Sequence, residues 1–233
     1  MELFLVPVAH VSKRSVEQVR RAIEKYRPEV VAIELDPQRL VAMTKKKEPR
    51  ALEFLAKPFF GLLYLFQKFM GKQLKVTPGN EMLEAVKAAQ EAGIPIALVD
   101  RPIGQTMQRM SLIPLREKLS LVAQVVLAPL MFVPSPFARK KVSIEEMAGD
   151  RELVEGILMQ FKKKLPVMYK VLVDERDEYM FRRVASLKAE RVVLVVGAGH
   201  LKGITRRLDK MNEEILANKK AREMAGETGG AAS

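Results

Sequence analysis

Four short apolar runs alternate with amphipathic segments along most of the chain. They cover residues 3–8, 30–35, 94–99 and 191–196, and polar or turn residues follow each run at once. Continuous apolar runs, as opposed to strict alternation, are typical of parallel strands that are covered on both faces, with helices as the crossovers. The pattern therefore predicts an α/β domain with a mainly parallel central sheet flanked by helices.

Two predicted helices have recognisable ends. Asp36 followed by Pro37 indicates an N-cap with proline in the first helical position. A second helix is expected over residues 81–92, where Gly93 would end it.

Two further stretches are apolar without the pattern of a strand, and they predict a helical insert at about residues 51–75 and 112–165. The insert would belong to one domain of residues 1–210, followed by a basic tail, helical to disordered, over 211–233. Residues 119–138 carry no charge and are long enough to span a bilayer, but three prolines interrupt them. A helix buried in a homodimer or lying on a membrane is therefore favoured over a spanning helix.

Composition narrows the classes of function. The 233 residues include no cysteine, which excludes disulfides, thiolate metal sites and a cysteine nucleophile. The net charge of +12 favours an anionic partner, such as an acidic membrane surface. Nucleic acid ranks lowest among anionic partners, because the basic clusters are scattered and no aromatic residues are interleaved with them. The apolar start of the chain is too short for a signal peptide, so we expect a cytoplasmic protein.

Polar residues follow all four predicted strands, where sites form in open parallel sheets. These residues are His10, Glu34, Asp36, Asp100, Arg101 and His200. His10 and His200 are the only two histidines of the chain. Their placement beside carboxylates indicates a metal site or an acid–base cluster, although structural histidines, an N-cap at Asp36 and an ion pair of Asp100 with Arg101 remain alternatives.

Two acidic residues are predicted to be buried. Glu34 has apolar neighbours in a strand that should be covered on both faces, so it needs a cation, a metal or several donors. Glu175 lies on the apolar face of a helix predicted over residues 167–188. It would either form an internal salt bridge with an arginine such as Arg101 or Arg109, or take part in catalysis. The glycines around His200 would permit close approach of the backbone.

Six ordered motifs resemble the TraB/PrgY family, including its archaeal members, over residues 3–210. They are AHVS (9–12), IELDPQR (33–39), PGNEM (78–82), DRPIGQTMQR (100–109), ERD (175–177) and VVGAGHLKGI (195–204). That family is similar to the Tiki proteases, the GumN proteins and the erythromycin esterase and ChaN group, which share two GxxH motifs and a strand-end glutamate. The second GxxH is Gly197–His200 here, whereas Pro7 replaces the glycine of the first and His10 is kept.

The resemblance implies the erythromycin esterase and ChaN type of fold and a metal-dependent hydrolase, in the first place a peptidase. His10, Glu34 and His200 would hold a divalent ion, either zinc, manganese, iron or cobalt. Glu175 would be the general base, and Arg101, Arg109 or Arg176 would stabilise an oxyanion or clamp a substrate carboxylate. The residues expected to bind substrate are Arg39, Glu81, Asp100, Arg109, Arg176 and Asp177.

A different class of function remains open beside the hydrolase. The chain could sequester a peptide, or act as a membrane-associated regulator, with the same cleft and without turnover. In both cases the expected partners are a peptide, an anionic membrane surface and a second copy bound through the apolar insert. The expected location is the cytoplasm or the inner face of the membrane, either as a separate protein or as the soluble domain of a membrane-anchored one.

Overall fold

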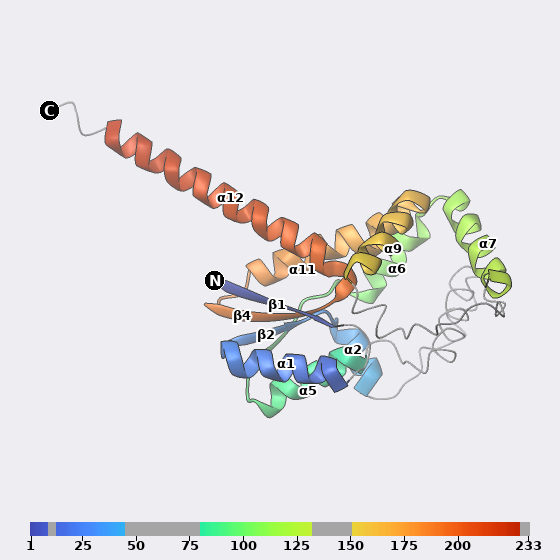
Figure 1. Ribbon diagram of the computed structural model, residues 1–233, viewed down its shortest axis with the longest axis horizontal. Helices are drawn as coiled ribbons and strands as arrows, with labels where there is room; N and C mark the ends of the chain where they lie inside the picture. The colour runs from blue at the N-terminus through green and yellow to red at the C-terminus, as the bar shows by residue number, and fades with distance from the viewer. Residues whose placement is uncertain (9–12, 45–79, 132–150, 229–233) are drawn as a thin grey trace.

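A computed structural model describes residues 1–8, 13–44, 80–131 and 151–228 (Figure 1). Within these residues, four strands form one sheet in the order β1-β4-β2-β3, and every neighbouring pair is parallel. The strands are β1 (Glu2–Val8), β2 (Val30–Ile33), β3 (Ile96–Leu98) and β4 (Arg191–Gly197). The α/β class and the parallel sheet predicted from the apolar runs are confirmed.

Helices make up most of the remaining described chain. They are α1 (Lys13–Tyr26), α2 (Pro37–Thr44), α5 (Asn80–Glu91), α6 (Ile103–Ser111), α7 (Leu115–Met131), α9 (Arg151–Lys164), α10 (Pro166–Tyr169), a π-helix (Lys170–Asp174), α11 (Glu175–Ala185) and α12 (Ala198–Thr228). Figure 1 shows α1 and α5 on one face of the sheet and α11 and the start of α12 on the other. The sheet is thus the middle of three layers.

Both faces of the central strands are buried, which explains their continuous apolar sequences. Val193 and Val195 of β4 pack into the core on the side of α1 and α5. Val192 and Leu194 of the same strand face the opposite core, where Met180 of α11 packs against them. Because successive side chains of a strand point to opposite faces, a strand between two helical layers has to be apolar at every position.

The predicted helix ends agree with the structure. The Asp36 carboxylate caps α2, because its Oδ1 accepts hydrogen bonds from the backbone N–H of Gln38 at 3.0 Å and of Arg39 at 3.2 Å. Gly93, with φ of +70°, follows α5 in the left-handed conformation that favours glycine at helix ends. Asp36 is therefore the N-cap of α2, which was the predicted alternative to a role in the metal or acid–base site.

A third core joins α6, α10 and the π-helix near the carboxyl ends of the strands. Met110, Leu165 and Met168 are buried in it. Buried Glu117 of α7 supports the same region, since its carboxylate accepts hydrogen bonds from the backbone N–H of Val167 (3.1 Å) and Met168 (2.9 Å) at the start of α10. These contacts fix the helical segment that carries the polar residues described below.

The predicted insert is helical where it is described, in α7 and α9, and residues 51–75 lie outside the described part. The boundary expected at residue 210 falls inside α12, which continues to Thr228 and extends away from the sheet (Figure 1). Among the described helices, none is both long and apolar enough to cross a membrane.

Candidate functional site

Polar side chains from three neighbouring strands meet at the carboxyl edge of the sheet. Glu34 follows β2, Asp100 follows β3, and His200 lies in the first turn of α12, directly after β4. All three are buried. Arg176 of α11 reaches into this group from the helical layer above the sheet.

Arg176 is the centre of the cluster. Its Nε donates to Asp100 Oδ1 (3.0 Å), and its Nη2 donates to Glu34 Oε1 (2.5 Å) and to Asp100 Oδ2 (2.7 Å). Its Nη1 donates to the Leu172 carbonyl (3.3 Å) and lies 3.1 Å from His200 Nε2. A guanidinium has five N–H donors, and each of them meets an acceptor here. Burial opposes the charge of Arg176, but the carboxylates of Asp100 and Glu34 outweigh it and raise the pKa of Arg176 above its ordinary value.

The Asp177 carboxylate binds one ring nitrogen of His200 and fixes the orientation of the imidazole. Its Nδ1 lies 2.6 Å from Oδ1 of Asp177, which is buried. Since a carboxylate accepts hydrogen bonds, Nδ1 carries the proton, and Nε2 of the neutral ring offers a lone pair to Arg176. When Nε2 is protonated, it can instead donate to Glu34 Oε1, which lies 3.3 Å away.

The two carboxylates beside His200 keep its imidazole basic. Burial alone would lower the pKa of His200, but the charge of Glu34 and the hydrogen bond with Asp177 outweigh burial and raise it. Burial raises the pKa of Asp177 against the opposing effect of His200. An imidazole that is oriented on one nitrogen and has its other nitrogen facing a carboxylate can accept and return a proton.

Glycines at the end of β4 and in α12 make room for the carboxylates of Glu34 and Asp177. The backbone N–H of Gly197 donates to Glu34 Oε2 at 2.7 Å, and a Cβ at this position would lie 3.2 Å from the same oxygen. A Cβ at Gly203 would overlap the carboxylate of Asp177. The close backbone approach predicted around His200 is therefore confirmed, and it serves Glu34 and Asp177.

Asp100 is paired with two arginines. Arg176 and Arg39, whose Nη1 lies 3.1 Å from Asp100 Oδ2, overcome the effect of burial and hold the pKa of Asp100 below its ordinary value. Arg101 contributes its backbone N–H to Asp100 Oδ1 at 2.7 Å, but its guanidinium bonds elsewhere. The alternative of a local ion pair between Asp100 and Arg101 is thus wrong, because packing directs the Arg101 side chain towards the π-helix.

Three arginines donate hydrogen bonds to backbone carbonyls of the π-helix. Arg101 Nη2 donates to the Val171 carbonyl (2.7 Å), Arg176 Nη1 to that of Leu172 (3.3 Å), and Arg207 Nη2 to that of Asp174 (2.9 Å). The wider turn of a π-helix is frequent at functional sites. Each of these arginines also binds a carboxylate, so the π-helix is fixed to its neighbours by charged side chains.

Glu175 forms the internal salt bridge that was one of its two predicted roles. It accepts hydrogen bonds from Arg101 Nη1 (2.7 Å) and from Arg109 Nε (3.1 Å) and Nη2 (2.5 Å). The hydrogen bond with Arg109, more than any other contact, holds the pKa of Glu175 below its ordinary value. A carboxylate stabilised in this way is a weak base. The catalytic role of Glu175 stays a prediction.

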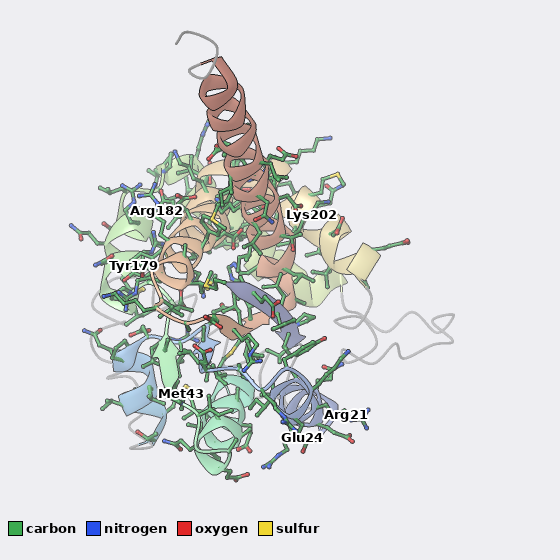
Figure 2. All side chains as sticks on the ribbon, turned by 90° about the vertical axis from the view of Figure 1, so that its left-hand side faces the viewer. Arg21, Glu24, Met43, Tyr179, Arg182 and Lys202 are labelled. Atoms are coloured by element: carbon green, nitrogen blue, oxygen red, sulfur yellow. The ribbon has the colours of Figure 1, made fainter. Side chains whose placement is uncertain are left out.

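The solvent-facing side of α11 carries a different set of charges. Here an open groove of about 490 Å³ is lined by Arg101, Lys170, Asp174, Glu175, Glu178, Tyr179, Arg182 and Arg207. Figure 2 shows Tyr179 and Arg182 near each other to the left of α12 in this view, and Lys202 to the right of that helix. The lining of this groove does not include Arg176, Glu34 or His200, so the groove is distinct from the cluster that these three residues form.

Two predicted site residues cannot be placed with the rest. His10 lies outside the described residues, and Glu81 belongs to α5 but its side chain is not described. In the described part of the chain, no group of three histidine or acidic side chains is arranged to hold a metal ion. Glu34 and His200 both face Arg176, so as they stand the described residues do not fit a metal, and the metal remains a prediction that depends on His10.

Sequence reasoning expected a close backbone approach at the glycines around His200 but did not find that Gly203 meets Asp177; it also missed Arg207 and assigned Asp177 to substrate binding. Arg207 lies beside Asp177, with its Nη1 3.8 Å from Oδ2, so Asp177 is enclosed by Gly203, Arg207 and His200. The available signal was the glycine three residues after His200 in the GAGHLKG stretch. It indicated a close backbone approach but not the partner.

The fold and the cluster together define an α/β protein with a buried His–Asp pair beside a glutamate and an arginine at the carboxyl ends of parallel strands. The chain belongs to the TraB/PrgY/gumN family, whose profile matches residues 2–214. It is 32% identical over 228 residues to the uncharacterized protein MJ1365 of Methanocaldococcus jannaschii, covering 90% of this chain and 54% of that protein. It is 30% identical over 241 residues to the TraB domain-containing proteins of Bos taurus and Homo sapiens, covering 87% of this chain and 61% of each of them. The chain thus spans little more than half the length of these relatives.

Proposed function

We propose that this chain is a hydrolase that cleaves peptides, with His200 as the general base. The observation that carries the proposal is the orientation of one imidazole. Asp177 binds Nδ1 at 2.6 Å, and Nε2 is directed at Glu34 and Arg176 at the carboxyl edge of the sheet. A histidine held by a buried carboxylate is the arrangement that hydrolases of several folds use to take a proton from a nucleophile.

The proposed step is the attack of water on a peptide carbonyl. For this step Arg176 Nη1, which lies 3.1 Å from Nε2 of His200, has to release that nitrogen. Nε2 then takes a proton from the water, and the imidazolium that forms is stabilised by Asp177 on one side and by Glu34, at 3.3 Å, on the other. The same proton can then pass to the leaving amine. The peptide as substrate follows from the motifs that resemble the TraB/PrgY family.

Arg39 is the proposed contact for the substrate. Among its interactions with the described residues, one side-chain hydrogen bond is present, to Asp100, and a third of the side chain is exposed. Its remaining N–H groups can therefore bind a peptide carbonyl or carboxylate. The N–H groups of Arg176, in contrast, are all engaged, so we assign Arg176 to holding Glu34 and Asp100. A divalent ion on His10, Glu34 and His200, which the family motifs imply, remains an untested prediction. It would occupy Nε2 of His200, so it is the alternative to His200 as the base and not its cofactor.

Digestion of a mixed peptide library, read by mass spectrometry, tests the proposal. The wild-type protein should cleave peptides without added divalent metals, and His200→Ala should abolish cleavage. Cleavage that requires an added metal would favour the ion over His200 as the base. Asp177→Asn should lower the rate by about 10²–10⁴-fold, the usual contribution of a positioned acid–base group. Asp209→Asn, an exposed site on the same helix as His200, is the matched control and should cleave as the wild type does. Intact peptides in all conditions would contradict the proposal.

A second function is peptide binding without turnover. It is favoured by the contacts of Arg176 with both Glu34 and His200, because they occupy the groups that would otherwise act on a water molecule. In that case the same peptides would be retained intact by the protein. Arg39→Ala would then weaken retention, because it removes the proposed contact for the peptide.

Part of the apolar insert supports the proposed contact with a membrane or a second copy. Leu115 and Leu119 are exposed one turn apart at the start of α7, and Leu112 is exposed in the turn that precedes this helix. The location at the inner face of a membrane remains a prediction.

A further inference from the structure

We propose that two copies of this chain pair through the outer edge of β1, in antiparallel orientation, and so join their sheets into one. The partner is a second copy, bound by backbone hydrogen bonds and by the aromatic residues beside the strand. This interface lies outside the cluster of Arg176, Glu34 and His200, and the inference does not rest on the proposed hydrolase.

The outer edge of β1 presents backbone groups that no described strand pairs with. Among the described strands, β1 is the last on its side of the sheet and pairs with β4 alone. Glu2 donates its N–H to the Glu190 carbonyl, so the even-numbered residues of β1 direct their N–H and C=O groups towards β4. The odd-numbered residues Leu3, Leu5 and Pro7 direct theirs outwards. Leu3 and Leu5 therefore each offer one donor and one acceptor at the edge.

The sequence of β1 gives this edge little protection against pairing. Proline, charged side chains and short length are the features that usually protect an edge strand. Pro7 is tolerated because its position faces away from β4, and it protects only the end of the strand. The strand has seven residues and a single charge, at Glu2, whereas the other edge strand, β3, has only three residues. The long edge is therefore the one that favours a partner.

The outward groups match a second copy of the same strand. Leu3 and Leu5 lie symmetrically about Phe4, so an antiparallel copy centred on Phe4 places Leu3 opposite Leu5 of the partner subunit. Each such pair can exchange both of its backbone hydrogen bonds. The two-fold axis through Phe4 closes the assembly at two copies. The net charge of +12 makes two copies repel, but β1 carries no basic residue, so the repulsion is weak at this edge.

Phe4 and Tyr26 would lie at the centre of the interface. Both are partly buried, and their rings are stacked with centroids 3.9 Å apart and planes at 12°. In the proposed register Phe4 faces its own copy in a non-hydrogen-bonded pair, where the Cα atoms are about 4.5 Å apart. Aromatic pairs across strands stabilise sheets, and pairing would remove the exposed part of the Phe4 ring from water.

The mass of the full chain in solution, measured by sedimentation equilibrium, tests whether the copies associate. The wild-type protein should have twice the mass of one chain, and the mass should fall towards that of one chain on dilution. A monomer at every concentration would overturn the inference.

Introduced cysteines test the register, because the chain has no cysteine of its own. Phe4→Cys should form a disulfide between two copies under mild oxidation, since disulfides span Cα separations of about 4.4–6.8 Å. Leu3→Cys is the matched control on the same edge. It should not link to itself, because Leu3 faces Leu5 of the partner subunit, but it should link to Leu5→Cys when the two variants are mixed.

A dimer in which Phe4→Cys forms no disulfide, or in which Leu3→Cys links to itself as readily, would overturn the inference. Such a dimer would use another surface, for example the apolar insert.

Amide hydrogen exchange of the wild-type protein covers the case in which Phe4→Cys does not fold. The N–H groups of Leu3 and Leu5 should exchange as slowly as those of Phe4 and Val6, which face β4, and faster once dilution separates the copies. Fast exchange of Leu3 and Leu5 at every concentration would overturn the inference. Slow exchange in a monomer would overturn it too, because the chain itself would then cover the edge.

The hydrolase proposal fails separately from this one. In an antiparallel pair the carboxyl ends of the two sets of strands point in opposite directions, so each copy keeps its own cluster. Cleavage of peptides by a monomer contradicts the interface alone, and a dimer linked through Phe4→Cys that cleaves no peptide contradicts the hydrolase alone.

Discussion

Asp177 orients His200, and its own position depends on the backbone beneath it. The carboxylate lies against Gly203, binds His200 Nδ1 through Oδ1, and has Arg207 3.8 Å from Oδ2. An imidazole acts as a base in a defined direction only when its other nitrogen is fixed. The chemistry proposed for His200 therefore depends on a glycine three residues further along the same helix.

Gly203→Ala should disturb this support. The added Cβ would overlap the Asp177 carboxylate, which is buried and cannot move aside without losing His200. Overpacking of this kind costs about 1–3 kcal/mol. Urea unfolding should show that loss, and peptide cleavage should fall with it.

Gly156→Ala in α9 is the matched control, because nothing lies within 4 Å of a Cβ at that position. Replacing a glycine within a helix should leave the free energy of unfolding unchanged or raise it by up to about 1 kcal/mol. A Gly203→Ala variant that is as stable and active as Gly156→Ala would contradict the role given to Gly203.

Among the elements, the π-helix and α11 join the polar cluster to α6. Arg101, just before α6, binds both Glu175 and the carbonyl of Val171, and Arg109 of α6 binds Glu175 again. Arg176 follows Glu175 in sequence and enters the cluster on the other side of the helix. The salt bridge of Glu175 thus fixes the rotation of the helix that carries Arg176 and Asp177.

Glu175→Gln should be destabilising in a pH-dependent way. Because the pKa of Glu175 is lower in the folded than in the unfolded protein, its ionised form stabilises the fold at pH values above the ordinary glutamate pKa of about 4.3. This stabilisation is lost as the pH falls through the folded-state pKa. The difference in unfolding free energy between wild type and Glu175→Gln should be about 1.5–3 kcal/mol at pH 7, in the range of hydrogen bonds to charged groups, and should shrink below about pH 4.

The control for Glu175→Gln is Glu213→Gln, an exposed position on α12. This variant should unfold with the same free energy as wild type at both ends of the pH range. A difference for Glu175→Gln that persists unchanged to pH 3 would show that its salt bridge with Arg101 and Arg109 is not the cause.

For the whole molecule, the sequence predicted which strands and acidic residues are buried, but not which side chains the buried acids contact. Apolar runs predicted four parallel strands because strands covered on both faces tolerate few polar side chains. The same rule identified Glu34 and Glu175 as acids that need partners, and both have them. It could not identify Arg176 as the partner of Glu34, because the two residues are 142 positions apart and meet only through the packing of α11 on the sheet.

Local patterns indicated a helical tail but not that it continues the helix after β4 without a break. A domain end at residue 210 was expected, with a basic tail after it that is helical to disordered; α12 runs through this boundary to Thr228, with Ile215 and Leu216 exposed. Helix continuation there follows from the good helix formers in the sequence, and it needs no packing face.

The state of the His200 ring tests the central claim most directly. Nitrogen NMR of histidine-labelled protein, at a pH of about 8.5 and with His200→Ala for assignment, distinguishes which ring nitrogen carries the proton. We predict that Nδ1 is protonated and Nε2 is not, and that Asp177→Asn weakens this preference while Asp209→Asn does not. A His200 ring protonated on Nε2 in the wild-type protein, or one that Asp177→Asn leaves unchanged, would contradict a base held by Asp177 and directed at Glu34 and Arg176.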